Sequence, residues 1–272
     1  MAQIRPSEWI VRVKQAHPLV HNITNLVVMQ ISANALLAAG ASPVMAHAVD
    51  EVPDMVRIAN AVVLNIGTLD PGWVGSMRVA AESARLEGVP VVLDPVGAGA
   101  TAYRTQVAHE LLMLAHPAVL RGNAGEIGVL ARGAGRVRGV DADGATVAEE
   151  DARRLATRSG AVVVATGPVD LVTDGRRTAH IANGHPWLET VTGTGCSLSA
   201  IVAAFVATAT RGGDVDERMD ATIAALLYFE VAAERAAVQA RGPGSFAVAL
   251  LDELATMPPD AVDAAAQVTW QV

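Results

Sequence analysis

Short apolar runs alternate along the chain with longer segments whose apolar residues recur at helical spacing. The runs that we expect to form strands start at Leu19 and then cover 42–46, 61–67, 89–94, 118–120 and 161–167. The segments that we expect to be helical include 26–39, 50–60, a stretch ending at Glu87, one after Thr101, and 146–159. Strand, loop and helix recur about every 28 residues, the length of a βα unit with a right-handed crossover, which predicts a parallel sheet.

The pattern changes in the second half of the chain. Two apolar runs, 169–173 and 178–182, flank Asp174-Gly175 and predict a hairpin, so the sheet should become mixed at that edge. Two long helices are expected at 214–240 and 246–257, and the C-terminal Val-Thr-Trp-Gln-Val predicts a small edge strand. No linker divides the chain, and we therefore expect one domain over residues 1–272.

One glycine-rich stretch, 129–146, carries charges of both signs and is typical of a surface loop around short helical pieces. The helix expected after it begins Thr146-Val147-Ala148-Glu149, which fits a capping box. The sequence therefore predicts a sharp transition from loop to helix near residue 146.

Composition narrows the class of partner. Hydrophobic residues are 51% of the chain but aromatic residues only 3%, so the core must consist of Ala, Val, Leu and Ile, which suits buried parallel strands covered by Ala-rich helices. The net charge of -8 and the absence of a Lys/Arg cluster argue against nucleic acid or an anionic membrane as the main partner. A small molecule is the expected partner.

The chain also lacks the usual signs of export. Its N-terminus has no apolar core of a signal peptide, and a single cysteine cannot form an intramolecular disulfide. The longest apolar run, 199–210, is shorter than the roughly 18 residues that a membrane span needs and predicts a buried helix. We expect a cytoplasmic location.

Residues 192–198, Thr-Gly-Thr-Gly-Cys-Ser-Leu, lie between a predicted strand and a long small-residue helix. Two glycines two apart allow a tight turn that directs several N–H groups to one point at the helix N-terminus, where anions bind. Cys196 is the only cysteine and lies inside this turn. A helix N-terminus should lower the pKa of its thiol and favour a thiolate, although an isolated cysteine in an apolar protein is usually a small buried hydrophobe.

Polar residues follow the other predicted strands at the edge where ligands of open α/β sheets gather. They are Asn65, Gly67, Thr68, Asp94, Arg121, Asn123, Glu126, Thr166 and Gly167. Phosphoryl transfer needs a metal, donors for the phosphate oxygens and a group that orients the acceptor hydroxyl. Asp94 and Glu126 are oxygen ligands suited to Mg²⁺, directly or through water, and Arg121 can bind a phosphate.

The same residues also have ordinary structural interpretations. Asp94 before Pro95 can end a strand, and Glu126 can be a first-turn helix acid. Arg121 can pair with a surface carboxylate, and Thr166-Gly167 can form a plain turn. Common nucleotide motifs are missing, because the chain has no G-x-x-x-x-G-K-[ST] loop and residues 193–198 do not complete G-x-G-x-x-G. A nucleotide site here must be of another type.

Five segments, in this order, resemble the marker motifs of the hydroxyethylthiazole kinase family. They are 21–25 (HNITN), 65–69 (NIGTL), 94–101 (DPVGAGAT), 121–127 (RGNAGEI) and 192–197 (TGTGCS). The resemblance implies a ribokinase-like three-layer α/β fold and phosphorylation of the hydroxyl of 4-methyl-5-(2-hydroxyethyl)thiazole by ATP and Mg²⁺ in thiamine salvage. It also implies a homotrimer with active sites between subunits.

The resemblance assigns a role to each motif residue. Asn25, Met45, Gly67 and Gly193 would bind the thiazole, with Met45 donated by a neighbouring subunit. Cys196 would be the catalytic residue, in an anion hole formed by Gly193, Thr194, Gly195 and Cys196. Asp94 and Glu126 would serve the metal, and ATP would contact Arg121, Asn123 and Thr166. Gly125, where the family has Ser, and Pro168 depart from the pattern.

Two other functions remain open on the sequence. The same fold could act on another substrate, such as a pyrimidine or pyridoxal-type alcohol, or catalyse ATP-dependent dehydration of a hydrate. A non-catalytic protein could also have kept the nucleotide site for binding or regulation. A thiazole-alcohol kinase is the leading hypothesis, because all the residues that phosphoryl transfer needs are present.

Overall fold

The computed structural model describes residues 4–133, 149–210 and 214–271. One sheet of nine strands runs through the described residues in the order β2-β1-β3-β4-β5-β6-β7-β8-β9. Neighbours from β2 to β6 pair in parallel, and β7, β8 and β9 are antiparallel to their neighbours. The strands are β1 (Leu19–Ile23), β2 (Ser42–Val44), β3 (Ala61–Asn65), β4 (Val91–Asp94), β5 (Val119–Asn123), β6 (Val162–Thr166), β7 (Asp170–Thr173), β8 (Thr178–Ile181) and β9 (Val268–Gln271).

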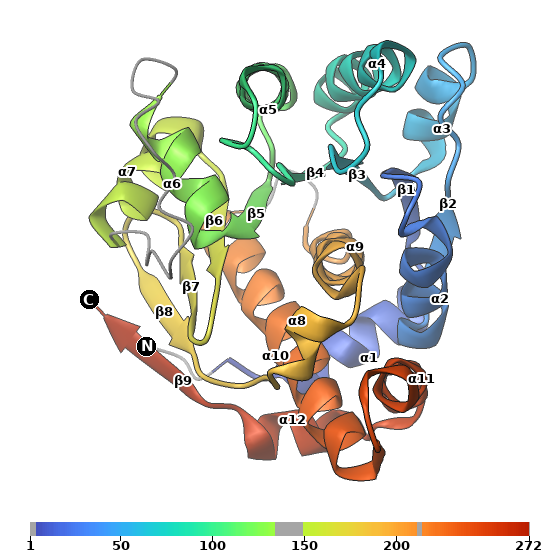
Figure 1. Cartoon of the computed structure of the whole chain (residues 1–272), viewed down its shortest axis with the longest axis vertical. Helices are drawn as coiled ribbons and strands as arrows, with labels where there is room; N and C mark the ends of the chain where they lie inside the picture. Colours follow the sequence, from blue (N-terminus) through green and yellow to red (C-terminus); the bar gives the residue numbers. More distant parts are fainter. Residues whose placement is uncertain (1–3, 134–148, 211–213, 272) are drawn as a thin grey trace.

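Helices cover both faces of this sheet and make three layers (Figure 1). One face carries α3 (Val52–Ile58), α4 (Pro71–Glu87), α5 (Ala102–Ala115), α6 (Ala124–Arg132) and α7 (Glu149–Ser159). The other face carries α1 (Pro6–Ala16), α2 (Met29–Ala39), α8 (Trp187–Thr190), α9 (Thr194–Val206), α10 (Val215–Gln239), α11 (Pro243–Thr256) and α12 (Pro259–Ala265). The predicted α/β class, with a mainly parallel sheet flanked by helices, is confirmed.

Strand β3 shows why the strands read as continuous apolar runs. Ala61 and Val63 point into the core beneath α9 and α10, whereas Val62 and Leu64 point into the core beneath α4 and α5. Successive side chains of a strand face opposite sides of the sheet, so a sheet covered on both faces needs apolar residues at every position. The polar residues that end such runs therefore mark the rim of the sheet.

Local capping fixes where the helices begin and end. The Asp70 side chain accepts hydrogen bonds from the N–H groups of Gly72 and Trp73 at the start of α4, and the Thr101 side chain accepts one from the N–H of Arg104 at the start of α5. Gly40 follows α2 with a φ of 89°, a left-handed conformation that suits glycine. These caps place the loops after β3 and β4 at the rim that the site occupies.

Several sequence predictions need correction. A short helix, α8, and a turn precede the 192–198 segment, where a strand was expected. The helix after Gly193 ends at Val206, before the end of the apolar run at 210, and α11 is followed by the unexpected α12. Residues 26–28 form a turn, and α2 begins at Met29 rather than at residue 26. The capping box at Thr146 and the greater part of the predicted 129–146 loop lie outside the described residues, and 129–132 belongs to α6.

No helix in the described ranges is long and apolar enough to cross a membrane. The hairpin at 169–182 and the C-terminal edge strand, by contrast, both form as expected. The cytoplasmic location and the single domain stay predictions.

Candidate active site

Hydrogen bonds join polar side chains from four separate segments at the carboxyl edge of the sheet. Nδ2 of Asn25 donates to Oδ1 of Asn65 at 2.9 Å, and Nδ2 of Asn65 donates to Oδ2 of Asp94 at 2.8 Å. Oγ of Ser199, on α9, donates to the same Asp94 oxygen at 2.8 Å. The parallel register that pairs Asn65 with Asp94 brings these groups together. The sheet edge and α9 thus share one buried polar network.

The N-terminus of α9 lies beside this network. Gly193 caps the helix with a φ of 92°, and a Cβ at this position would lie 2.9 Å from Cγ2 of Ile31 and 3.0 Å from Cγ1 of Val28. Both the left-handed conformation and the close packing require glycine. The first N–H groups of a helix have no intrahelical acceptor, so Thr194, Gly195 and Cys196 present a point suited to an anion.

Arg121 lies directly over this helix start. A Cβ on Gly195 would be 2.8 Å from Nη1 of Arg121, so only glycine allows the guanidinium so close to the backbone. Nη2 of Arg121 donates to Oγ1 of Thr166 at 3.0 Å, and its buried Nε has no hydrogen-bond partner among the described residues. A guanidinium with a free donor beside a helix N-terminus is suited to phosphate oxygens.

Burial changes the protonation of Cys196. Desolvation, and then the negative charge of Asp94, raise the pKa of the thiol to about 11. Hydrogen bonds with Asn65 and Asn25 and the charge of Arg121 oppose this shift but do not overcome it. The expectation that the helix N-terminus lowers this pKa and yields a thiolate is therefore wrong. Sγ of Cys196 lies 3.5 Å from Nδ2 of Asn25 and remains a protonated thiol at neutral pH.

Asp94 is the buried carboxylate of this network. It is 1% exposed, and desolvation raises its pKa to about 6, with the charge of Glu126 adding to the shift. The charge of Arg121 and the hydrogen bonds from Ser199 and Asn65 lower the pKa and keep the carboxylate ionised at neutral pH. A buried carboxylate of this kind gains most from a cation that enters the site.

Glu126 bridges two loops of the rim. Its Oε1 accepts from the N–H of Gly97, in the loop after β4, at 2.7 Å, and its Oε2 accepts from the N–H of Asn123 at 2.8 Å. The Asn123 side chain accepts from the N–H of Glu126 in turn, which completes a capping box on α6. The structural interpretation of Glu126 as a first-turn acid therefore holds, and the side chain of Asn123 takes part in the same cap.

The acidic residues fit a metal that arrives with a ligand. Across the described ranges, no group of three or more His, Cys, Asp or Glu side chains is arranged to hold a metal ion. Asp94 and Glu126 nevertheless lie close enough for the charge of one to raise the pKa of the other. Mg²⁺ commonly binds through one or two carboxylates, several waters and substrate phosphates, so the residues present fit that mode.

Gly67 and Met45 differ in how this chain places them. A Cβ on Gly67 would lie 2.5 Å from Nδ2 of Asn25, so the loop after β3 packs against the Asn25 amide without room for a side chain. Met45 instead follows β2, which is the edge strand and is separated from β3 by β1. Gly67 thus contacts Asn25 directly, while Met45 follows a strand that β1 separates from β3.

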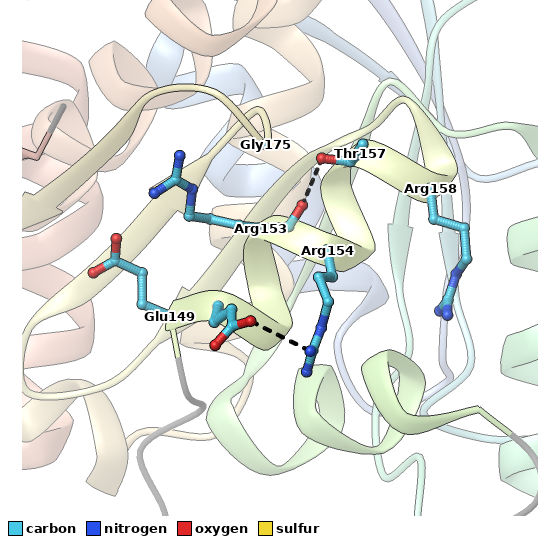
Figure 2. Close-up of a pocket in the computed structure, with 7 residues that line it drawn as sticks. Glu149, Arg153, Arg154, Thr157, Arg158 and Gly175 are labelled. Carbon is cyan, nitrogen blue, oxygen red and sulfur yellow. Dashed lines mark hydrogen bonds and ion pairs between the residues drawn. The ribbon is translucent and has the colours of Figure 1, made fainter.

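A cavity of about 640 Å³ opens next to Arg121 and the start of α9. Its lining includes the predicted nucleotide residues Arg121, Asn123 and Thr166, and the helix residues Thr194 and Gly195. A larger hollow of about 730 Å³ lies on α7, between Arg153, Arg154 and Glu149 (Figure 2), but none of the predicted site residues lines it. We therefore place the site at the rim of the sheet.

Sequence reasoning missed several contributors. Arg104, in the first turn of α5, donates hydrogen bonds to the carbonyl oxygens of Ile66, Gly67 and Val96 and ties two rim loops together. Ser199 contacts Asp94, and a polar residue three positions after Cys196 in an apolar helix was a usable signal. Arg104 carried no such signal, because a basic residue on a helix is usually solvated.

Comparisons with known proteins show which family the chain resembles. Residues 10–260 match the Hydroxyethylthiazole kinase family. A hydroxyethylthiazole kinase of Pyrococcus horikoshii is 52% identical over 251 residues, which cover 91% of this chain and 91% of the relative.

Solved structures extend the agreement to the fold. The structure of hydroxyethylthiazole kinase from P. horikoshii superimposes with a TM-score of 0.88 at 46% identity, covering 98% of this chain and 99% of that one. A ribokinase-like superfamily protein from Enterococcus faecalis gives 0.60 at 13% identity, covering 89% and 88%. The second likeness concerns the fold alone, and it confirms the ribokinase-like architecture.

Proposed function

The chain belongs to the hydroxyethylthiazole kinase family, and on that premise we propose that it transfers the γ-phosphoryl group of ATP to the hydroxyl of 4-methyl-5-(2-hydroxyethyl)thiazole. One observation carries the proposal: the N-terminus of α9 and the Arg121 guanidinium line a cavity of about 640 Å³, and the buried Asp94 carboxylate, bonded to Ser199 of α9, interacts with the charge of Arg121. Phosphoryl transfer relies on positioning and electrostatic stabilisation, and these groups supply both.

In the proposed reaction the alcohol lies between Asn25, Gly67 and Gly193, and the triphosphate extends along Arg121 and Thr166. The backbone N–H groups of residues 194–196 and the positive charge of the Arg121 guanidinium stabilise the negative charge on the transferring phosphoryl group. The thiol of Cys196, which is neutral, orients the hydroxyl toward phosphorus. A loose transition state needs little help from a general base, so the hydroxyl proton passes to the transferred phosphoryl oxygens or to water as ADP leaves.

We propose that Mg²⁺ accompanies ATP and is held by Asp94 and Glu126, directly or through water. When bound, the ion neutralises phosphate charge. Asp94 supplies a buried negative charge that its surroundings do not fully compensate, which supports this assignment. Glu126 already accepts two backbone hydrogen bonds and would act through water.

The decisive measurement is ADP release from ATP by the purified chain with and without the thiazole alcohol and Mg²⁺. We expect turnover only with both, and mass spectrometry should identify the phosphorylated thiazole. A pyridoxal-type alcohol and a hydroxymethylpyrimidine serve as competing acceptors, and a hydrated dinucleotide tests the dehydratase alternative. Tight thiazole binding without any ATP turnover would favour the non-catalytic function.

We also propose a homotrimer in which Met45 reaches the site of a neighbouring subunit. Met45 follows an edge strand, and Leu26, Val27 and Leu37, before and on the adjacent α2, are 60%, 70% and 60% exposed, as expected of an interface. Sedimentation should give three times 28.1 kDa, and Met45→Ala should raise KM for the thiazole but not for ATP. A fully active monomer would exclude the shared site.

A further inference from the structure

Two buried carboxyl groups in the wall of the cavity have no part in the proposed reaction. They are Asp170 of β7, which is 6% exposed, and Glu230 of α10, which is 4% exposed. Charged side chains are rarely buried to this extent without a partner. Their place in the wall suggests a role for the nucleotide.

Asp170 fixes the loop that carries Thr166. The register of the antiparallel β6 and β7 pairs Ala165 with Leu171, so Thr166 and Asp170 close the loop 167–169. The N–H of Gly167 donates to Oδ1 of Asp170 at 2.9 Å. Since Thr166 accepts the hydrogen bond from Arg121, the Asp170 carboxylate indirectly supports the position of Arg121.

Glu230 approaches Asp170 from the helix that covers β6 and β7. Burial raises the pKa of Glu230 well above its ordinary value, and the negative charge of Asp170 and the hydrogen bond between the two carboxyls raise it further. Burial also raises the pKa of Asp170, but the hydrogen bonds from Glu230 and Gly167 oppose that shift. Two carboxyls this close in a buried place resist ionising together, so the pair as a whole holds its last proton more strongly than a solvated carboxyl does.

Other charged groups surround this pair. Arg121 of β5 lowers the pKa of both carboxyls, and Glu234, one turn later on α10, raises that of Glu230. His185 and Glu189, from the segment before α9, line the same cavity. Oε2 of Glu230 has no hydrogen-bond partner among the described residues, so no donor there stabilises a second negative charge on that oxygen.

We propose that Asp170 and Glu230 are positioning residues of the nucleotide site, which share one proton and so hold the 167–169 loop while placing only one negative charge near Arg121. The inference rests on the proposed function, because it requires the triphosphate in this cavity. When the pair loses its proton, a second negative charge faces the phosphates. Nucleotide affinity then falls as the pH rises.

Binding of Mg-ATP to the whole chain, measured by calorimetry without the thiazole between about pH 7 and about pH 10, tests this. Wild type should lose about tenfold more affinity over this range than Glu230→Gln, whose neutral amide can still donate to Asp170 at every pH. Glu217→Gln, near the other end of the same helix and outside the cavity lining, is the matched control and should keep the wild-type loss. Equal pH dependence in wild type and Glu230→Gln would overturn the inference.

A second measurement detects the proton on the carboxyl pair in the absence of nucleotide. Carbon-13-edited infrared spectra of wild type at neutral pH should contain the C=O band of a protonated carboxyl that Glu230→Gln lacks. In Asp170→Asn the band should disappear at a lower pH than in wild type, because the charge that raises the Glu230 pKa is gone, while the amide oxygen still accepts from Gly167. A spectrum at neutral pH that lacks this band would overturn the inference that the two carboxyls share a proton. If wild type binds no ATP at any pH, the proposed nucleotide site is wrong. The infrared band still shows whether the carboxyl pair holds a proton.

Discussion

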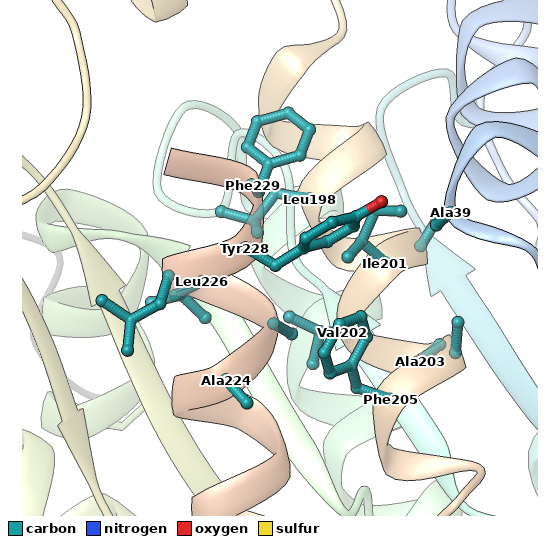
Figure 3. Close-up of a cluster of buried hydrophobic side chains, with 14 of the residues drawn as sticks. Ala39, Leu198, Ile201, Val202, Ala203, Phe205, Ala224, Leu226, Tyr228 and Phe229 are labelled. Atoms are coloured by element: carbon teal, nitrogen blue, oxygen red, sulfur yellow. The ribbon is translucent and has the colours of Figure 1, made fainter. Parts of the chain in front are cut away.

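The two ends of α9 are both packed inside the protein, but they have opposite chemistry. From Leu198 to Phe205 the helix packs its apolar side chains against α10, with Ile201 and Val202 in the same cluster as Tyr228 (Figure 3). In its first two turns the same helix places Cys196 near Asn25 and Ser199 against Asp94. One helix therefore belongs to the core and to the site.

The difference lies in what burial does to the free energy of folding. In the apolar half each buried Leu, Ile, Val or Phe side chain stabilises the fold by about 1.5–3 kcal/mol relative to exposure. In the polar half burial disfavours the charged forms and raises the pKa of Asp94 to about 6 and of Cys196 to about 11. The site is thus a locally costly region that the apolar half offsets, and substitutions can separate the two contributions.

The largest effect should come from Phe205→Ala in the apolar half. Phe205 is fully buried, with its ring centroid 5.6 Å from that of Tyr228. Its truncation leaves a cavity and should lower the free energy of unfolding by about 3–5 kcal/mol. Denaturant unfolding measures this, while the activity of the folded fraction should stay close to wild type. Val238→Ala on α10, 88% exposed, is the control and should change stability by less than about 0.5 kcal/mol.

Asp94→Asn should act in the opposite direction and raise the free energy of unfolding. It removes the buried charge but keeps an oxygen that accepts hydrogen bonds, so we expect activity to be lost and stability at neutral pH to rise. The folded pKa of about 6 exceeds the model-compound value of 3.8, so ionisation destabilises wild type as pH rises through this window. The shift corresponds to about 3 kcal/mol, on the order of the expected gain.

Unfolding curves of wild type and Asp94→Asn at several pH values measure this gain. Below about pH 4 both side chains are neutral, and the two stabilities should converge. An asparagine variant less stable than wild type at neutral pH would contradict the view that the site is costly.

Cys196→Ala should have a smaller effect on turnover than the change at Asp94. Loss of an orienting thiol should reduce kcat by about 10- to 100-fold without abolishing it, below or at the low end of general-base effects. Because its pKa is about 11, the thiol is neutral throughout the working range, and the kcat profiles of the two enzymes between about pH 6 and about pH 9 should be parallel. Full activity of the alanine enzyme would remove any role for Cys196 in the reaction.

The comparison between the halves of α9 also explains what the sequence could predict about the fold. Apolar periodicity predicted most strands and helices, because a parallel sheet covered on both faces requires apolar residues throughout. It could not predict α8 or α12, because helices of four and seven residues offer too little periodicity. Their formation depends on tertiary packing against α9 and α10.

For the site, motif position predicted which side chains meet but not their protonation. Asn25, Asn65 and Asp94 follow strands that pairing brings together, so their proximity could be inferred. The prediction of a thiolate at Cys196 was wrong, because desolvation raises the thiol pKa more than the helix N-terminus lowers it. Desolvation depends on the whole packing around α9, which no local motif reveals. Likewise, the Asp170–Glu230 pair joins residues far apart in sequence, and no motif marks it.

Ser199→Ala should give the smallest effect and the finest comparison, because α9 carries its own control. Oγ of Ser199 donates a hydrogen bond to Oδ2 of Asp94 at 2.8 Å and lowers the pKa of that carboxyl. Its loss should reduce stability at neutral pH by about 1–2 kcal/mol and move the acid limb of kcat/KM to higher pH. Ser197→Ala, on the same turn, removes a buried hydroxyl that has no hydrogen-bond partner in the described residues and should leave both unchanged. If the two alanine variants behaved alike, the hydroxyl of Ser199 would act only as a packed group, and the charge of Asp94 would depend on Asn65 and Arg121 alone.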